Sequence, residues 1–471
     1  MLVIKNPSFT SQGDRRRVTY YILLLFLLAL GLRLLYASVV LKQFAELSTA
    51  EQTSYKIGYL MPDSGGYLEP AADLMKGHIR QAISLIRPIG YPAFLALLRA
   101  NPSATLYAQA ILLSLIPICT FLLVRLLTES NLLGFAAGVA SSISPTGIAV
   151  GSLVMSDALF ASLFAVVFTT MVYGIVHHSL RWVVFSAIGS GFAILVKPIL
   201  LFWPVVAVVV SALIVACQNE SRNNSRRWLQ IDKSRYTQML VLFFVPIIFI
   251  ISMAGANYKK YGTFTVSIAG KLSLREYLAV RTEEWGIAGH LPSQDAIRQN
   301  QNILRKRTRI QEEAYPWVSE SIAIFKKYPI QTIKAFVMDA QEQVVGGWND
   351  FSYQLPFSQH QLAFSRISNL ETRLRKIALL ITFFAPFVGL VRVWIDPSPY
   401  LRRLVPMLFA MNMTFLYFVM LSGITFWSGP RIIYPTEILE ISTAAVLVAA
   451  LVRGTRARLA LGLPNISTAK A

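Results

Sequence analysis

The chain contains repeated apolar runs of roughly 20 residues, and these runs constrain its fold more than any other feature. A helix of that length crosses the hydrocarbon core of a bilayer with its backbone hydrogen bonds satisfied internally. The whole chain is 55% hydrophobic and 14% charged, whereas soluble domains are about 25% charged. Its two cysteines, Cys119 and Cys217, exclude a disulfide scaffold and a cysteine-based zinc cluster. The composition therefore excludes a soluble enzyme, a secreted mini-protein and a disordered chain.

The apolar runs predict an all-α polytopic membrane protein with about ten transmembrane helices. The first run is too long and too rich in leucine for a signal peptide, and no small-residue cleavage site follows it, so we expect a retained anchor. The fifth and sixth runs meet at Lys197-Pro198, where the proline breaks the helix. The expected spans are 18–40, 105–127, 131–150, 155–176, 182–196, 199–217, 239–256, 377–393, 404–421 and 432–452.

The distribution of the basic residues predicts the orientation of these spans. The formal net charge is +20, which in a soluble protein would suggest a nucleic-acid partner. If the N-terminus is cytoplasmic, the short outer turns hold only Lys197 and Arg431. The positive-inside rule then places both termini in the cytoplasm, and no nucleic-acid partner is needed to explain the charge. The cations on the cytoplasmic side are Lys5, Arg15, Arg16, Arg17, Arg125, Arg181, Arg222, Arg226, Arg227, Lys233, Arg235, Arg392, Arg402, Arg403, Arg453, Arg456, Arg458 and Lys470.

Two long outer segments divide the chain. Residues 1–256 form a membrane module that includes a re-entrant-like first outer loop, 41–104. Residues 257–376 form a mixed outer, periplasmic domain between spans seven and eight, and this segment is long enough to fold by itself. Residues 377–471 hold the last spans and a basic cytoplasmic tail.

The first outer loop carries the residues most suited to chemistry. Pro62-Asp63-Ser64-Gly65-Gly66-Tyr67 is a tight turn that presents one carboxylate, with a tyrosine four residues later. Arg87-Pro88-Ile89-Gly90-Tyr91-Pro92 follows in the same loop. As an alternative, Asp63 caps the helix that we expect over 67–76.

Further motifs lie at the outer ends of later spans. They are Ser156-Asp157-Ala158-Leu159-Phe160, Gly191-Phe192-Ala193-Ile194-Leu195-Val196-Lys197-Pro198 and Tyr261-Gly262-Thr263-Phe264. In their order and sidedness, these motifs and the first outer loop resemble the membrane glycosyltransferases of the GT-C superfamily. The likeness is to the bacterial relatives of protein O-mannosyltransferases and of the aminoarabinose transferase that acts on lipid A. It covers about residues 18–270, and the last span adds only Arg431 and Tyr434.

The resemblance implies an inverting glycosyltransferase of the inner membrane. Such an enzyme moves a sugar from a polyprenyl-phosphate donor to a glycolipid, glycan or protein acceptor at the outer face. A positioned carboxylate would take the proton of the acceptor hydroxyl, and fixed cations would stabilise the departing phosphate. The resemblance and the placement together predict Asp63 and Asp157 as catalytic residues, Arg87, Lys197 and Arg431 as phosphate ligands, and Tyr67, Tyr91 and Glu437 as substrate-positioning residues.

Several of these residues have alternative roles. Asp157 could orient Arg87 or Lys197, or hold the acceptor. Lys197 could be a snorkelling lysine at a helix end, and Arg431 could pair with Glu437 or Glu440, which lie in an apolar run.

No cofactor is predicted, although a divalent metal is an alternative. The five histidines show no ligand spacing. Many of the relatives carry two adjacent acids in the first loop, whereas Ser64 follows Asp63 here.

Two other classes of function fit a long polytopic chain. A transporter or flippase for lipid-linked sugars is one, but such proteins tend to consist of related halves, and no internal repeat is visible. An O-antigen-ligase or polymerase type of enzyme is the other, and that class usually places basic catalytic residues in a large late loop.

Overall fold

The computed structural model describes residues 12–47, 59–60, 63–220, 233–308, 316–345, 358–395, 399–424 and 433–460. Within these ranges the protein is helical and contains no strand, as the apolar periodicity predicts. The helices of the bundle are α1 (Gln12–Ala45), α6 (Pro102–Leu113), α7 (Leu115–Thr128), α8 (Asn131–Ser142), α9 (Pro145–Val150), α10 (Ser156–Val176), α11 (Leu180–Val196), η1 (Pro198–Leu200), α12 (Trp203–Glu220), α13 (Lys233–Tyr261), α20 (Ser358–Ile395), α21 (Pro399–Ser422), η4 (Tyr434–Thr436) and α22 (Glu437–Ala460).

Among the described residues, seven helices are long and apolar enough to cross a membrane. Two of the expected spans, the fifth and sixth, form shorter apolar helices, Leu180–Val196 and Trp203–Val215. The expected span 131–150 is divided into α8 and α9, so the count of ten stays a prediction. The seven candidate spans are Gly13–Ala45, Pro102–Thr128, Ser156–Val176, Lys233–Tyr261, Asn369–Ile395, Leu404–Ser422 and Tyr434–Val452.

Prolines set two of the breaks. Lys197 has extended dihedrals, φ −147° and ψ 117°, and ends α11 directly before Pro198. Ser144 has ψ 117° directly before Pro145, which begins α9. A residue that precedes proline is driven out of the helical region because its own backbone collides with the proline ring. Both breaks therefore follow from the sequence, although only the one at Lys197 was expected.

Helix α10 lies at the centre of the bundle, and most of its side chains are buried. It shares an aromatic core with α12 and α21. The ring of Phe164 lies 5.4 Å from that of Trp203 and 4.9 Å from that of Phe418, in edge-to-face geometry that aromatic rings prefer. By contrast, large apolar side chains of α1 and α13 such as Leu24, Leu27 and Ile248 are exposed on the surface of the bundle. A belt of this kind fits contact with lipid.

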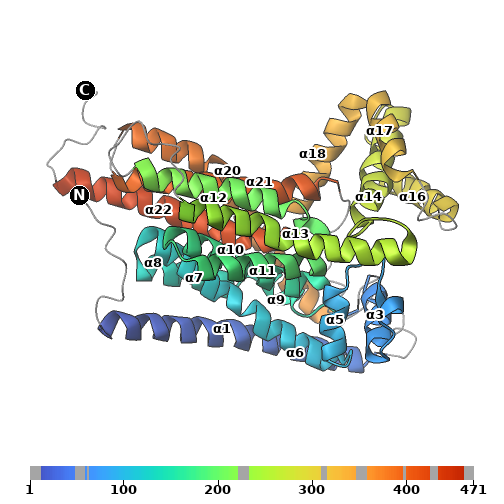
Figure 1. Cartoon of the computed structure of the whole chain (residues 1–471), viewed down its shortest axis with the longest axis horizontal. Coiled ribbons are helices and arrows are strands. Elements are labelled where there is room, and N and C mark those ends of the chain that lie inside the picture. The colour runs from blue at the N-terminus through green and yellow to red at the C-terminus, as the bar shows by residue number, and fades with distance from the viewer. Residues whose placement is uncertain are drawn as a thin grey trace.

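The remaining helices gather at one end of the bundle, opposite the first residues of α1 and the last residues of α22 (Figure 1). We call this end the loop end. The first loop contributes α3 (Gly65–Met75), α4 (Ile79–Ala82) and α5 (Gly90–Leu97). The segment between α13 and α20 contributes six elements, which we call the cap helices: α14 (Ala269–Ser273), η2 (Leu274–Ala279), α15 (Val280–Ala288), α16 (Gln294–Thr308), α17 (Trp317–Lys327) and α18 (Pro329–Val345). Helix α13 extends to Tyr261 and α20 begins at Ser358, so both helices run past the boundaries 257 and 376 expected from the sequence.

Candidate active site at the loop end

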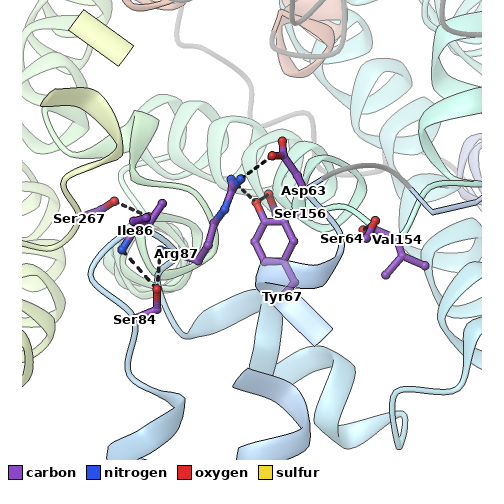
Figure 2. Close-up of polar contacts among 9 residues, drawn as sticks. All are labelled: Asp63, Ser64, Tyr67, Ser84, Ile86, Arg87, Val154, Ser156 and Ser267. Carbon is purple, nitrogen blue, oxygen red and sulfur yellow. Dashed lines mark hydrogen bonds and ion pairs between the residues drawn. The ribbon is translucent and has the colours of Figure 1, made fainter. Parts of the chain in front are cut away.

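Arg87 joins Asp63 and Tyr67 (Figure 2). Its Nη2 lies 2.8 Å from Asp63 Oδ1, and its Nη1 donates a hydrogen bond of 3.0 Å to Tyr67 Oη. The guanidinium carbon also lies 4.8 Å from the centroid of the Tyr67 ring. The side chains of Arg87 and Asp63 are 27% and 39% exposed, so this ion pair is open to a ligand. Helix α3 begins at Gly65 with Ser64 as its N-cap residue, so Asp63 is not the cap of this helix.

Tyr67 connects this ion pair to the start of α10. Its Oη lies 3.0 Å from Ser156 Oγ, and since arginine only donates, the phenol proton is left for Ser156. Burial raises the pKa of Tyr67, while the Arg87 charge and the contact with Ser156 lower it by less. The side chain is therefore a neutral phenol at physiological pH.

Asp157 and Lys197 form a second ion pair beside the first. Lys197 Nζ lies 2.5 Å from Asp157 Oδ1, and the side chains are 19% and 3% exposed. Asp157 stands in the first turn of α10, where the helix dipole favours a negative charge. Lys197 therefore has a carboxylate partner and does not merely reach for solvent. Because Tyr67 contacts both Arg87 and Ser156, the residue directly before Asp157, the two ion pairs belong to one site.

Tyr91 packs against Tyr67 on the buried side of the site. Its ring meets that of Tyr67 edge to face at 5.0 Å, and its hydroxyl donates to Gln109 Oε1 at 2.8 Å. Gln109 Nε2 in turn donates to the carbonyl oxygens of Gly151 and Leu153, in the turn that leads to α10. Tyr91 is completely buried, which raises its pKa well above the ordinary value. It is thus placed to support Tyr67 from within the core.

Glycine is required where α5 meets α11. A Cβ on Gly90 would lie 2.6 Å from the carbonyl oxygen of Leu195, which is backbone and cannot rotate away. This close approach brings the first loop against the helix that ends at Lys197.

The segment that precedes Arg87 accepts hydrogen bonds from residues 260–268, at the end of α13 and in the loop that follows it. Four backbone carbonyl groups within residues 81–86 accept these bonds. They restrict the conformation of the backbone that leads to Arg87. The bonds are Lys260 Nζ to Gln81 O and Ile83 O, Tyr261 Oη to Ile83 O, Ile268 N to Leu85 O, and Ser267 Oγ to Ile86 O. Figure 2 shows Ser267 and Ile86 beside Arg87. Ser84 Oγ also accepts the backbone N–H of Arg87 at 3.2 Å.

Glu437 lies in a different cluster, so the structure does not bring it into contact with the two ion pairs. Its carboxylate accepts a hydrogen bond of 2.5 Å from Ser144 Oγ. Around it are further buried ionisable side chains, and none of them forms a salt bridge with another in the described residues. They are Arg33 of α1, Arg375 of α20 and Glu440 of α22, which are 1%, 8% and 3% exposed. Arg431 lies outside the described residues.

The described residues contain no group of three or more His, Cys, Asp or Glu side chains that could hold a metal ion. Asp63 and Asp157 are instead each paired with a cation, and neither is joined by a second carboxylate. The arrangement can thus hold an anion and move a proton.

The sequence pointed to the charged residues and the two tyrosines of the site, but not to Gln109 and Ser267, which hold Tyr91 and the backbone before Arg87. Gln109 and Ser267 are ordinary polar residues of a helix and a loop, and nothing in their spacing marks them. Arg33 was detectable, since a charged residue within an apolar run usually faces a partner or a cavity.

No protein-family model matches the chain, and no curated protein matches it in sequence.

Proposed function

We propose that the protein is a membrane glycosyltransferase that takes a sugar from a polyprenyl-phosphate donor at the loop end. The observation that carries this proposal is the continuous set of contacts from Asp63 through Arg87, Tyr67 and Ser156 to the Asp157–Lys197 pair. It combines carboxylates with fixed cations at one end of a lipid-embedded bundle. In this proposal the loop end faces outside, as the distribution of cations predicts.

In the reaction, the oxygen of an acceptor hydroxyl attacks the anomeric carbon of the donor sugar. The bond from that carbon to the phosphate oxygen breaks on the opposite face, so the configuration inverts and the polyprenyl phosphate leaves with the bonding electrons. Asp63 accepts the hydroxyl proton. It suits this role because it is the more exposed carboxylate of the two, 39% against 3% for Asp157.

Arg87 and Lys197 are the cations assigned to the donor phosphate. Each keeps donor hydrogens beyond those used in its ion pair, since a guanidinium has five and an ammonium three. Preorganised donors of this kind stabilise charge that develops on a leaving group. Asp157 then positions Lys197, and Tyr67 positions Arg87, while Tyr91 supports Tyr67. Arg431 and Glu437 are retained as further substrate contacts on the sequence argument alone.

The test is Asp63→Asn in isolated membranes supplied with a radiolabelled polyprenyl-phosphate sugar. Asp73→Asn is the matched control, since Asp73 lies on the same helix α3 and its side chain takes no part in the site. We expect transfer to be lost in the first variant and kept in the second.

Two outcomes would contradict the proposal. Transfer at the normal rate by Asp63→Asn would refute its role as base. Movement of the labelled lipid across the membrane without transfer, in the wild-type protein, would indicate a transporter. A pH–rate profile without a fall toward low pH would mean that no group has to lose its proton before the reaction, so that the acceptor is already anionic and Asp63 positions it.

A further inference from the structure

Helix α18 has two different faces. Its buried face carries Ala335, Asp339 and Gln343, which are spaced four residues apart and turn toward the other cap helices. Its opposite face carries Ile330, Ile333 and Val337, which are 63%, 66% and 54% exposed. The spacing i, i+3, i+7 aligns these three side chains in one apolar stripe. An exposed apolar stripe on a helix indicates contact with an apolar partner.

The position of α18 indicates which partner this is. The ring of Phe336 lies against Gly423, so close that a Cβ there would be 2.6 Å from the ring. Gly423 directly follows the candidate span Leu404–Ser422, so α18 touches the bundle at the depth where this span ends. Val337 directly follows Phe336, and Ile333 lies one turn before it. Both side chains are therefore close to the level at which this candidate span ends. Figure 1 shows α18 leading from the other cap helices back to the bundle.

Two further features fit a lipid surface. Helix α18 also contacts α20, whose side chains Leu370 and Leu374 are 58% and 57% exposed on the bundle. The stripe thus lies on a helix that packs against a candidate span with exposed apolar side chains. Lys326 and Lys327, both exposed, end α17 just before α18 begins, and lysines at such positions reach lipid phosphates.

We infer that α18 is an interfacial helix, whose Ile330, Ile333 and Val337 side chains enter the bilayer leaflet at the loop end. This contact would hold the cap helices at a fixed height above the membrane. It rests on the bundle being embedded in a bilayer and does not depend on the proposed chemistry, so either could fail without the other.

The experiment measures the depth of spin labels in full-length protein reconstituted into nanodiscs of phosphatidylethanolamine and phosphatidylglycerol. Cys119 and Cys217 are first replaced by alanine, and a nitroxide is placed at Ile333→Cys. Leu374→Cys on α20 is the lipid-facing reference, and Ile303→Cys on α16, 58% exposed, is the aqueous reference. Electron paramagnetic resonance then compares accessibility to oxygen, which concentrates in lipid, with accessibility to a water-soluble nickel chelate.

We expect the label at position 333 to favour oxygen, as at 374, while the label at 303 favours the nickel chelate. A label at 333 that behaves like the one at 303 would overturn the inference. Protection of 333 from both reagents would also overturn it, because it would mean that protein covers the stripe. Since all three label positions are exposed, none of the labels should disturb folding.

Discussion

Tyr67→Phe tests the contact that joins the two ion pairs. The change removes one oxygen atom and keeps the ring that packs against Tyr91. Arg87 Nη1 loses its 3.0 Å acceptor and Ser156 loses its partner, while the ion pair with Asp63 stays possible. A hydrogen bond to a charged group contributes about 1.5–3 kcal/mol. Because Arg87 is 27% exposed, water replaces part of this bond, so we take the lower value. About 1.5 kcal/mol corresponds to a roughly tenfold loss in kcat/KM.

The assay is transfer from a radiolabelled polyprenyl-phosphate sugar over a range of donor concentrations. Tyr59→Phe is the matched control, since Tyr59 is also buried and its hydroxyl makes no hydrogen bond to the described residues. Thermal unfolding of both variants in detergent separates an effect on the site from an effect on the fold. If Tyr67→Phe is as active as Tyr59→Phe, the Tyr67 hydroxyl does not position Arg87 for transfer.

Three further predictions follow from single contacts. Gly90→Ala should lower stability by about 1–3 kcal/mol, as forced overpacking does, because the new methyl meets backbone at 2.6 Å; Gly31→Ala, with nothing within 4 Å, should change thermal unfolding little. Asp157→Asn or Lys197→Met alone should cost about 3–5 kcal/mol, since each leaves a largely buried charge unpaired, and the double variant should regain stability but not activity. Burial raises the pKa of Asp339 from 3.8 to about 8, although Arg281 lowers it. Folding thus favours the protonated form of Asp339. The contribution of this carboxyl group to the stability near α18 should be complete below about pH 4 and be lost as the pH rises through 8. Hydrogen exchange corrected for intrinsic rates should show this fall, and Asp339→Asn should abolish it.

Much of the architecture followed from the sequence because hydrophobic length and proline are local signals. The apolar runs predicted a helical bundle, and the break at Lys197-Pro198 falls where it was expected. The break before Pro145 was missed because apolar residues further out on both sides, such as Val139 and Ile148, make the segment read as one span, although Ser144 and Thr146 flank the proline. A run of apolar residues specifies a helix more reliably than it specifies whether that helix crosses the membrane once or bends.

The site was only partly predictable, for a similar reason. Asp63 and Arg87 are charged residues of motifs in the first outer loop, and Asp157 and Lys197 lie at the ends of apolar runs, so each attracts notice by itself. Their pairing depends on how α3, α5, α10 and α11 pack, and no local pattern encodes it. The exact partners therefore came from the structure: Asp157 pairs with Lys197, one of two partners that the sequence suggested, and Asp63 pairs with Arg87.

The pairing of Arg87 with Asp63 has a consequence for donor binding. If Arg87 binds the donor phosphate, the phosphate must compete with Asp63 for the guanidinium, so the carboxylate weakens donor binding while serving as base. Asp63→Asn should then abolish transfer and yet tighten binding of polyprenyl phosphate. Because the pair is partly exposed, it is worth about 0–1 kcal/mol, which corresponds to a gain of up to about fivefold in affinity. Filtration binding with radiolabelled polyprenyl phosphate measures this gain, and Arg87→Gln should lose binding. Weaker binding by Asp63→Asn would mean that the carboxylate holds Arg87 in place for the phosphate and does not compete with it.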